Sequence, residues 1–424
     1  MSILGVAERR RPERAIWWII GIAFILRLIA IPIFGSDPAN RSLYEYGRIA
    51  INIVQGHGFS FDFAGRYPLQ YTAYSPALYC YTLVPWYWLF GVNFLGPRIM
   101  HAAFLATACW FLYKIGTRLV NRRVGLIAAA IWAVYPELVF LSIRIAPENV
   151  MFLPMLWMLW KATAVDPPAS RRGIFGAGAL LGLSCWVNPS LQVLGLAVPL
   201  HWGINGLFKR KAGLQQLVLF WLGAVLVIAP WTIRNYIRLG AFVPLRSAFA
   251  YNFWRGNHPG ATGTVRNFDF ECADEKLPPE YLAYIDAHLD PRDEIQRDRF
   301  FADEVKRFIQ ENPDEYLRLC LTRFFYYWWR DKTHSLTGNI WYLGPWLLTL
   351  IFAAYGGIRI RSRWKEWSVW ILQILGFTAL FALTIVVPRY RMPMYPALFL
   401  LAAVGADEFL NRFLNRKIPI PCEK

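Results

Sequence analysis

The stretch ALYCYTLVPWYWLFGV, residues 77–92, decides the topology of the chain. It is apolar, yet it is short for a membrane-spanning helix, has Pro85 in its middle and is rich in Trp and Tyr. A spanning helix needs about 20 apolar residues, whereas Trp and Tyr are enriched at the interface between lipid and water. If this stretch crossed the membrane, every later basic loop would fall on the outer side. We therefore predict that residues 77–92 lie flat in the outer interface.

The composition defines the broad class. Hydrophobic residues make up 56% of the 424 residues and charged residues only 17%, and apolar segments of spanning length recur along the chain. A soluble core would account for one or two such segments at most, so the pattern is that of a helical membrane protein. We expect an all-α polytopic membrane protein with about ten spanning helices, at residues 15–34, 97–119, 124–142, 149–165, 173–187, 191–207, 215–233, 340–358, 367–387 and 392–410.

The net charge of +17 is concentrated in clusters between the apolar segments. This distribution marks cytoplasmic loops and argues against nucleic-acid binding. With residues 77–92 in the interface, all clusters fall on one side, and both termini are predicted to be cytoplasmic. No small-residue cleavage site follows the first span, which predicts an uncleaved anchor. The clusters are Arg9, Arg10, Arg11 and Arg14; Lys114, Arg118, Arg122 and Arg123; Arg171 and Arg172; Lys209, Arg210 and Lys211; Arg359, Arg361, Arg363 and Lys365; and Arg412, Arg416 and Lys417.

Three regions follow from this topology. Residues 1–233 form an N-terminal transmembrane module with a first outer loop at 35–96. Residues 234–339 form a polar outer region that holds more than half of the acidic residues. Residues 340–424 supply the last spanning helices and a short cytoplasmic tail. The six cysteines have no metal-type spacing, although Cys272 and Cys320 could pair, and the histidines form no H-x-x-x-H pattern.

Acidic residues near the outer face are few, and three of them are candidate catalytic groups: Glu45, Asp37 and Glu148. Glu45 lies on an amphipathic helix, where a carboxylate partly shielded from water could act as a general base toward a hydroxyl or amine. It could instead be a solvated partner of Arg41 or Arg48. Glu148 follows RIAP at the start of a span, where an acid also suits the helix dipole.

Arginines on the same face offer complementary chemistry. The segment VVPRYRMPMYP, residues 386–396, puts Arg389 and Arg391 at the outer face, against the positive-inside trend. Arginine there is well matched to a phosphate, and Arg234, Arg246 and Arg255 follow another span. The alternative is pairing with the acidic outer region or with lipid headgroups. Arginines and carboxylates together suggest a lipid phosphate held beside an activated acceptor.

Four segments carry a resemblance to a known family: YEYGRIAINIVQGHGFSF, TAYSPALY, PWTIRNYIRLGAFVPLRS with GNHPGA, and PRYRMPMYPALFLLAA. In the same order from the first span to the last, they resemble bacterial polyprenyl-phosphate-dependent glycosyltransferases of the GT-C superfamily. The branch is the one similar to dolichyl-phosphate-mannose–protein mannosyltransferases. The resemblance implies a GT-C fold with juxtamembrane helices in the first outer loop, and an acidic base in that loop.

The resemblance also implies roles for particular residues. Many relatives have Asp where this sequence has Ser42, so the expected base is Glu45, with Asp37 in reserve and Glu148 as the second acid. The residues expected at the donor phosphate are Arg389, Tyr390, Arg391, Arg234 and Arg255. Those expected at the acceptor or sugar are Tyr46, His57, Tyr74, Asn257 and His258, although the two histidines also read as hydrogen-bonded structural residues.

The expected function is transfer of a hexosyl or pentosyl group, with inversion, from a polyprenyl-phosphate donor such as an undecaprenyl-phosphate sugar. The acceptor would be a lipid, glycan or protein at the periplasmic face of the bacterial inner membrane. No P-loop or G-x-G-x-x-G motif indicates a nucleotide cofactor, none is required, and no pattern indicates the divalent metal that such chemistry could accommodate. The alternatives are a transporter or flippase of lipid-linked sugars, which should show repeats or broken helices, and a non-catalytic scaffold.

Overall fold

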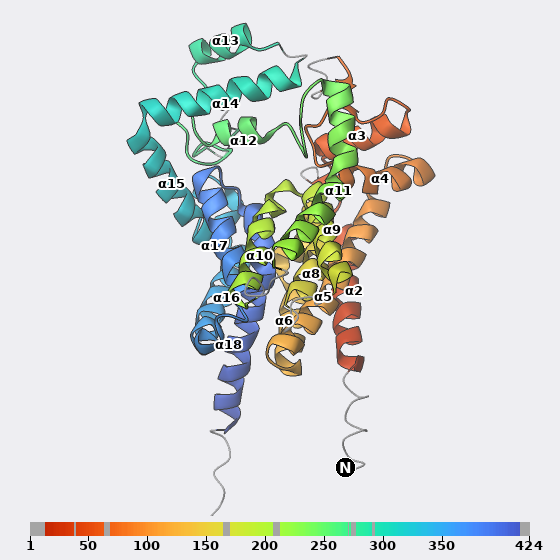
Figure 1. Cartoon of the computed structure of the whole chain (residues 1–424), viewed down its shortest axis with the longest axis vertical. Helices are drawn as coiled ribbons and strands as arrows, with labels where there is room; N and C mark the ends of the chain where they lie inside the picture. The colour runs from red at the N-terminus through yellow and green to blue at the C-terminus, as the bar shows by residue number, and fades with distance from the viewer. Residues whose placement is uncertain are drawn as a thin grey trace, which may run out of the picture.

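The computed structural model describes residues 13–37, 40–62, 68–163, 170–206, 213–269, 271–272, 277–290 and 293–415. Within these ranges the chain is almost entirely helical, with one two-stranded antiparallel hairpin that pairs Ser60 with Tyr71 and Phe61 with Gln70. The longer helices run side by side in a bundle, and the helices of the outer region lie across its upper end in Figure 1. Arg9, Arg10, Arg11, Lys209, Arg210, Lys211, Arg416, Lys417 and Cys422 lie outside the described residues.

Every predicted span contains a helix. Among the described residues, five helices or helical stretches are long and apolar enough to cross a membrane: 14–34, 95–119, 213–239, 340–359 and 388–412. The bundle helices are α2 (Glu13–Phe34), α5 (Leu95–Leu119), α6 (Arg122–Val134), α7 (Pro136–Leu141), α8 (Glu148–Ala162), α9 (Arg171–Val187), α10 (Val193–Ile204), α11 (Gly213–Leu239), α16 (Ile340–Arg359), α17 (Ser368–Leu383) and α18 (Tyr395–Asn415).

The structure differs from the predicted spans in four places, and prolines explain three of them. The predicted span 124–142 is broken into α6 and α7, because Tyr135 precedes Pro136 and is extended. Short 3₁₀ helices precede α10 and α18, namely η3 (Pro189–Gln192) and η8 (Pro388–Met394), each with Pro at its start. Helix α11 continues to Leu239, so the expected domain boundary after residue 233 falls inside a helix.

Small residues let the bundle helices approach closely. A Cβ at Gly178 of α9 would overlap the carbonyl oxygen of Phe220 in α11, and a Cβ at Gly356 of α16 would overlap that of Leu401 in α18. In lipid, where burial of apolar side chains gives little net gain, such backbone approach is a main source of helix–helix packing. The two contacts therefore hold α9 close to α11 and α16 close to α18.

Arg27 is the principal charge inside the first span, and it is fully buried. Its guanidinium donates hydrogen bonds to the carbonyl of Ala133 at 3.0 Å and to that of Trp132 at 3.3 Å. These carbonyls belong to the last turn of α6, whose C-terminal carbonyls lack partners within the helix. Arg27 thus caps α6 and gives no indication of an ion or substrate pathway.

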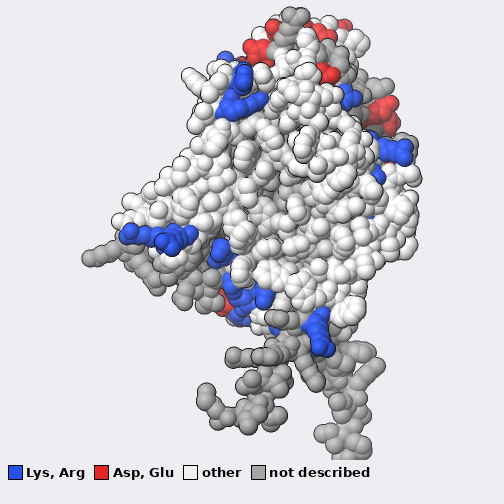
Figure 2. Space-filling model, turned by 90° about the vertical axis from the view of Figure 1, so that its right-hand side faces the viewer, with Lys and Arg blue, Asp and Glu red and all other residues white. Residues whose placement is uncertain are grey.

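The two ends of the bundle differ in charge. Figure 2 shows mostly Lys and Arg at the lower end of one face, most of the acidic side chains together with further Lys and Arg at the upper end, and a broad band without charge between them. In Figure 1 the start of α2 and the end of α18 both lie at the lower end, opposite the outer region. A band free of charge flanked by polar ends is the surface of a multi-pass membrane protein.

The first outer loop forms two helices, α3 (Tyr44–Val54) and α4 (Ala77–Phe90), joined by the strands β1 (Ser60–Phe61) and β2 (Gln70–Tyr71). Helix α4 ends with exposed aromatic and aliphatic side chains: Trp88 is 71% exposed, Leu89 61% and Phe90 65%. The short length of α4 and this apolar end fit the interfacial position predicted for residues 77–92.

The outer region consists of four helices and connecting segments. These are α12 (Phe249–Arg255), α13 (Pro279–His288), α14 (Glu294–Glu311) and α15 (Pro313–Trp328), followed by the 3₁₀ turn η6 (Ser335–Gly338). A further 3₁₀ turn, η7 (Arg361–Arg363), lies between α16 and α17, outside this region. Helix α12 packs against α14 around Trp254 and Phe301. Cys272 and Cys320, which the sequence left as a candidate pair, are both free thiols.

Candidate functional site

A cavity of about 490 Å³ lies where the first outer loop, the outer region and the bundle meet. Tyr46 of α3, Glu148 at the start of α8 and Arg389 of η8 line its polar side, together with Arg246 and Tyr390. Its other wall is largely apolar and consists of Val193, Leu245, Phe249, Phe253, Leu380, Phe381 and Ile385. The cavity can therefore hold a ligand that has both a charged group and an apolar portion.

Glu148 and Arg389 form a loose ion pair in this cavity. Glu148 Oε1 lies 3.7 Å from Arg389 Nε, and the two side chains are 6% and 38% exposed. This separation is too long for a hydrogen bond, and neither Glu148 Oε2 nor Arg389 Nε has a hydrogen-bond partner in the described part of the chain. Because buried polar groups are normally satisfied, both side chains retain capacity for a ligand.

Arg246 brings a second guanidinium to the same wall. Its Nε is also buried without a hydrogen-bond partner among the described residues, and its guanidinium lies 5.8 Å from the ring centroid of Tyr74. The charged residues that line the cavity are thus Arg246, Arg389 and Glu148. Two guanidinium groups against one carboxylate favour an anionic ligand group, and phosphate matches guanidinium geometry well.

Glu45 lies beside this cavity. Its neighbour Tyr46 is buried and lines the wall, while Glu45 itself is partly exposed. Burial raises the pKa of the Tyr46 hydroxyl well above its ordinary value, and the negative charge of Glu45 raises it further. The same two causes raise the pKa of Tyr74. Glu45 also interacts electrostatically with Arg389, so its carboxylate acts on several groups of the site.

The start of α3 shows what Ser42 does at the position where the resemblance expects an aspartate. The Ser42 hydroxyl accepts a hydrogen bond from the backbone N–H of Tyr44 at 3.2 Å. Tyr44 has a φ of +48°, which is uncommon for a residue other than glycine. Ser42 therefore shapes the turn that orients Glu45 and Tyr46.

Three arginines expected at the donor phosphate, Arg234, Arg255 and Arg391, do not line the cavity. Arg391 is 1% exposed and donates hydrogen bonds to the carbonyls of Tyr326 at 2.6 Å and Trp329 at 2.9 Å. Arg234 donates to the carbonyls of Thr72 at 2.7 Å and Phe59 at 2.8 Å. These hydrogen bonds join segments of the fold, and we propose a structural role for Arg234 and Arg391 in place of the expected contact with phosphate.

The remaining expected site residues are dispersed. Asp37 is exposed in the turn after α2, and His57 is exposed on the turn after α3. Arg255 ends α12, where its guanidinium lies 5.6 Å from the ring centroid of Tyr251. Asn257 and His258 line a second cavity of about 250 Å³, together with Trp254 near the end of α12.

Several polar residues of the main cavity were missed from the sequence, namely Asn188, Ser190, Gln192 and Asn252. The signal for the first of them was the NPS segment: the Asn188 side chain accepts a hydrogen bond from the backbone N–H of Ser190 at 3.1 Å and so caps η3. Among the described residues, no group of three or more His, Cys, Asp or Glu side chains is arranged to hold a metal ion.

The chain is similar to known proteins in part of its sequence and in its fold. Residues 75–233 match the family model described as dolichyl-phosphate-mannose-protein mannosyltransferase. The fold resembles that of ArnT from Cupriavidus metallidurans bound to undecaprenyl phosphate, with 13% identity and a TM-score of 0.53 over 94% of this chain and 61% of that chain. No curated protein matches the sequence.

Archaeal oligosaccharyltransferase structures are similar as well. AglB from Archaeoglobus fulgidus, in complex with an inhibitory peptide and a dolichol-phosphate, is 14% identical, with a TM-score of 0.55 over 96% of this chain and 52% of that chain. The apo form of the Archaeoglobus fulgidus oligosaccharyltransferase is 12% identical, with a TM-score of 0.56 over 94% and 51%.

These comparisons show the fold. The chain has the expected GT-C fold, similar to that of ArnT and of the archaeal oligosaccharyltransferases, and residues 75–233 resemble the mannosyltransferase family. The chain spans 61% of the ArnT chain and about half of the oligosaccharyltransferase chains.

Proposed function

We propose that this protein is an inverting membrane glycosyltransferase that moves a sugar from a polyprenyl-phosphate donor to a lipid, glycan or protein acceptor. The observation that carries the proposal is the main cavity, where Arg389, Arg246 and Glu148 each have a buried polar atom without a partner next to an apolar wall. A polyprenyl-phosphate sugar has matching parts: an anionic phosphate, a hydroxylated ring and an apolar chain.

In this proposal Arg389 and Arg246 hold the donor phosphate. Tyr390 lies in the same wall, and its ring stacks on Phe381 with centroids 4.6 Å apart. This stacking holds Tyr390 beside Arg389, while the apolar wall covers the first units of the polyprenyl chain. Positive charge at the leaving group stabilises the negative charge that develops there as the bond to the sugar breaks.

The base is assigned to Glu45 on geometric grounds. An inverting displacement needs the acceptor nucleophile and the leaving phosphate on opposite sides of the anomeric carbon. Glu148 is paired with Arg389, so its carboxylate belongs to the phosphate side of the site. Glu45 comes from a different element, α3, and is partly exposed, so it can meet an acceptor arriving from outside. Asp37 remains the reserve candidate.

In the proposed step, a proton moves to the protein and the sugar moves to the acceptor. The Glu45 carboxylate takes the proton of the acceptor hydroxyl or amine, and the acceptor oxygen or nitrogen forms a bond to the anomeric carbon. The bond between that carbon and the phosphate oxygen breaks, and its electron pair leaves with the polyprenyl phosphate. Arg389 and Arg246 stabilise the phosphate, and Glu148 positions Arg389.

We further propose the bacterial inner membrane as the location, with the cavity facing the periplasm and both termini in the cytoplasm. The basic lower end of the molecule and the common end at which α2 begins and α18 ends support this orientation.

The deciding experiment is a transfer assay with purified protein in lipid nanodiscs, a panel of undecaprenyl-phosphate hexoses and pentoses, and membrane lipid acceptors. We expect transfer by the wild type and its loss in Glu45→Gln, with unchanged expression and unfolding temperature. The matched control is Asp303→Asn, which changes an exposed acid of α14 away from the cavity. Full activity of Glu45→Gln would move the base to Asp37 or Glu148, and absence of transfer from every donor would refute the proposal.

A further inference from the structure

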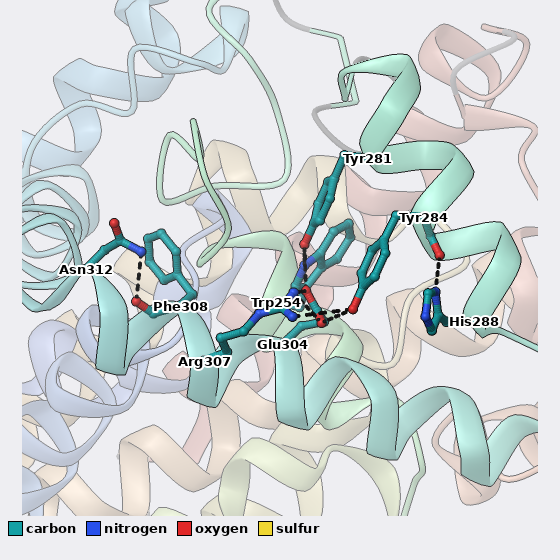
Figure 3. Close-up of polar contacts among 8 residues, drawn as sticks. All are labelled: Trp254, Tyr281, Tyr284, His288, Glu304, Arg307, Phe308 and Asn312. Atoms are coloured by element: carbon teal, nitrogen blue, oxygen red, sulfur yellow. Dashed lines mark hydrogen bonds and ion pairs between the residues drawn. The ribbon is translucent and has the colours of Figure 1, made fainter.

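The second cavity, of about 250 Å³, lies in the outer region and has its own set of polar and aromatic side chains. Figure 3 shows the polar contacts along it, between α13, α14 and the end of α12. A space of this volume admits several waters and is large enough for a small polar ligand such as one sugar residue. The residues that line it are Trp254, Asn257, His258, Pro259, Tyr281, Glu304, Arg307, Phe308, Glu311 and Asn312.

Glu304 organises the floor of this cavity and has no capacity left for a ligand. Its carboxylate accepts hydrogen bonds from Tyr281 at 3.1 Å and Tyr284 at 3.2 Å, and from Arg307 at 2.7 and 2.6 Å (Figure 3). These bonds fill the roughly four acceptor positions of a carboxylate. Trp254 in turn donates its indole N–H to the Tyr281 hydroxyl at 3.2 Å. The network therefore fixes the aromatic rings and Arg307 in place.

Other groups that line the cavity are still available. The Glu311 carboxylate and the Asn312 side-chain oxygen make no hydrogen bond within the described part of the chain, and Arg307 has N–H donors beyond its bonds to Glu304 and Tyr284. The Arg307 side chain is 48% exposed. The rings of Trp254 and Tyr281 add a firm apolar wall beside these donors and acceptors.

The lining also selects by charge. Its carboxylates are those of Glu304 and Glu311, and its one guanidinium is that of Arg307. Two carboxylates therefore face one guanidinium. A ligand with negative charge is disfavoured in such surroundings. A hydroxylated ring without negative charge fits, because its hydroxyl groups can pair with Glu311, Asn312 and Arg307 while its C–H face packs on an aromatic ring.

We propose that the second cavity is a binding subsite for a neutral or amino sugar residue. This inference rests on the proposed function, in which it would hold a sugar of a glycan-bearing acceptor. The place of the cavity supports this: Phe249 and Phe253 of α12 line the main cavity, and Trp254 at the end of the same helix lines the second one. An acceptor anchored at Trp254 would lie one helix away from the donor.

The test measures sugar binding directly, without turnover. Full-length protein in nanodiscs is titrated with the methyl glycosides of mannose, galactose and glucosamine, and with methyl glucuronide, by saturation-transfer NMR. We expect at least one neutral or amino glycoside to bind and the anionic glucuronide not to bind. Glu311→Ala and Asn312→Ala should each weaken the bound glycoside about three- to tenfold, the loss of one ligand hydrogen bond.

Asp303→Ala is the matched control, since Asp303 is an exposed acid on the same helix that does not line the cavity, and its glycoside affinity should equal that of the wild type. The inference is overturned if no glycoside binds, if methyl glucuronide binds as well as the others, or if both cavity variants bind like the control. Transfer activity is scored separately, so a wild type that binds glycosides without transferring sugar contradicts only the proposed function.

Discussion

Arg389→Gln should selectively weaken the binding of polyprenyl phosphate. Arg389 lines the main cavity, its one side-chain polar contact with the described residues is the loose pair with Glu148 at 3.7 Å, and its Nε is unsatisfied. Removing this guanidinium therefore breaks no hydrogen bond that holds the described fold together. The variant should keep the unfolding temperature of the wild type and lose a ligand contact.

The expected size follows from the chemistry of the contact. A hydrogen bond between a charged donor and a charged acceptor contributes about 1.5–3 kcal/mol, which corresponds to roughly 10- to 150-fold in the dissociation constant. The Arg389 side chain is 38% exposed, so solvent screening favours the lower part of this range. Glu148 adds a second effect, because without Arg389 its carboxylate faces the phosphate uncompensated, at a cost of about 1 kcal/mol or more.

This second effect makes a double-mutant cycle informative. The Glu148→Gln variant should bind undecaprenyl phosphate at least as well as the wild type, because a competitor for Arg389 is removed. Arg389→Gln should then weaken binding less in the Glu148→Gln background than in the wild type, by about fivefold, the equivalent of roughly 1 kcal/mol. Native mass spectrometry of nanodisc-embedded protein with undecaprenyl phosphate gives the four dissociation constants.

Arg318→Gln is the matched control, since Arg318 is 71% exposed on α15 and pairs with Glu315 at 3.2 Å away from the cavity. It should bind undecaprenyl phosphate like the wild type. If Arg389→Gln also binds like the wild type, Arg389 is not a phosphate ligand. If Glu148→Gln weakens binding as strongly as Arg389→Gln, the carboxylate contacts the donor itself and the assignment of Glu148 to a positioning role is wrong.

Three further predictions test the structural assignments. Arg391→Gln should leave two buried carbonyls without donors and lower the free energy of unfolding by about 2–5 kcal/mol, seen as a lower thermal midpoint in detergent, while the folded protein keeps its affinity for undecaprenyl phosphate. Glu294→Gln should weaken a buried contact between the first outer loop and α14, where the Glu294 carboxylate accepts a hydrogen bond from the backbone N–H of Ala73 at 2.9 Å. The free energy of unfolding should fall by about 1–2 kcal/mol, and an unchanged thermal midpoint would contradict this prediction. In a background without reactive cysteines, Arg172→Cys should react with a membrane-impermeant maleimide only from the cytoplasmic side and Lys306→Cys only from the outer side, and the reverse pattern would overturn the topology.

The spanning helices could be predicted from the sequence because their signal is local. Each apolar run lies in one continuous segment, and the structure has a helix within every predicted span. The errors occurred where a local feature opposes the run. Pro136 splits the span that was predicted to be continuous. Helix α11 extends six residues beyond the predicted end, because Arg234 donates a hydrogen bond to a carbonyl of the first outer loop and Arg238 lies over the ring of Tyr71.

The main cavity could be predicted only in part, because its residues come from segments far apart in the chain. Glu148, Arg389 and Tyr46 were expected and do come together. Asn188 and Asn252 were not expected, because an asparagine after a predicted span is as typical of a helix cap as of a binding site. Asn188 does cap a helix, η3. Composition near a predicted membrane face therefore identifies charged site residues better than neutral ones, because a charge at that depth requires an explanation and an amide does not.

The two arginines of the PRYR segment show why spacing alone could not assign their roles. Arg389 and Arg391 lie two residues apart at the same predicted membrane face, so the sequence predicts the same role for both. The segment forms the 3₁₀ helix η8, which has three residues per turn, so side chains two positions apart point about 120° away from each other. Arg389 consequently enters the main cavity beside Glu148, while Arg391 turns toward the end of α15, where its Nη2 donates to two backbone carbonyls and its Nε and Nη1 are buried without a partner among the described residues. An extended segment would have placed both side chains on one face, and the difference depends on the prolines that set η8, Pro388 and Pro393. We therefore propose that one arginine of the segment, Arg389, binds phosphate, and the contrast between Arg389→Gln and Arg391→Gln, affinity in one and stability in the other, tests that division directly.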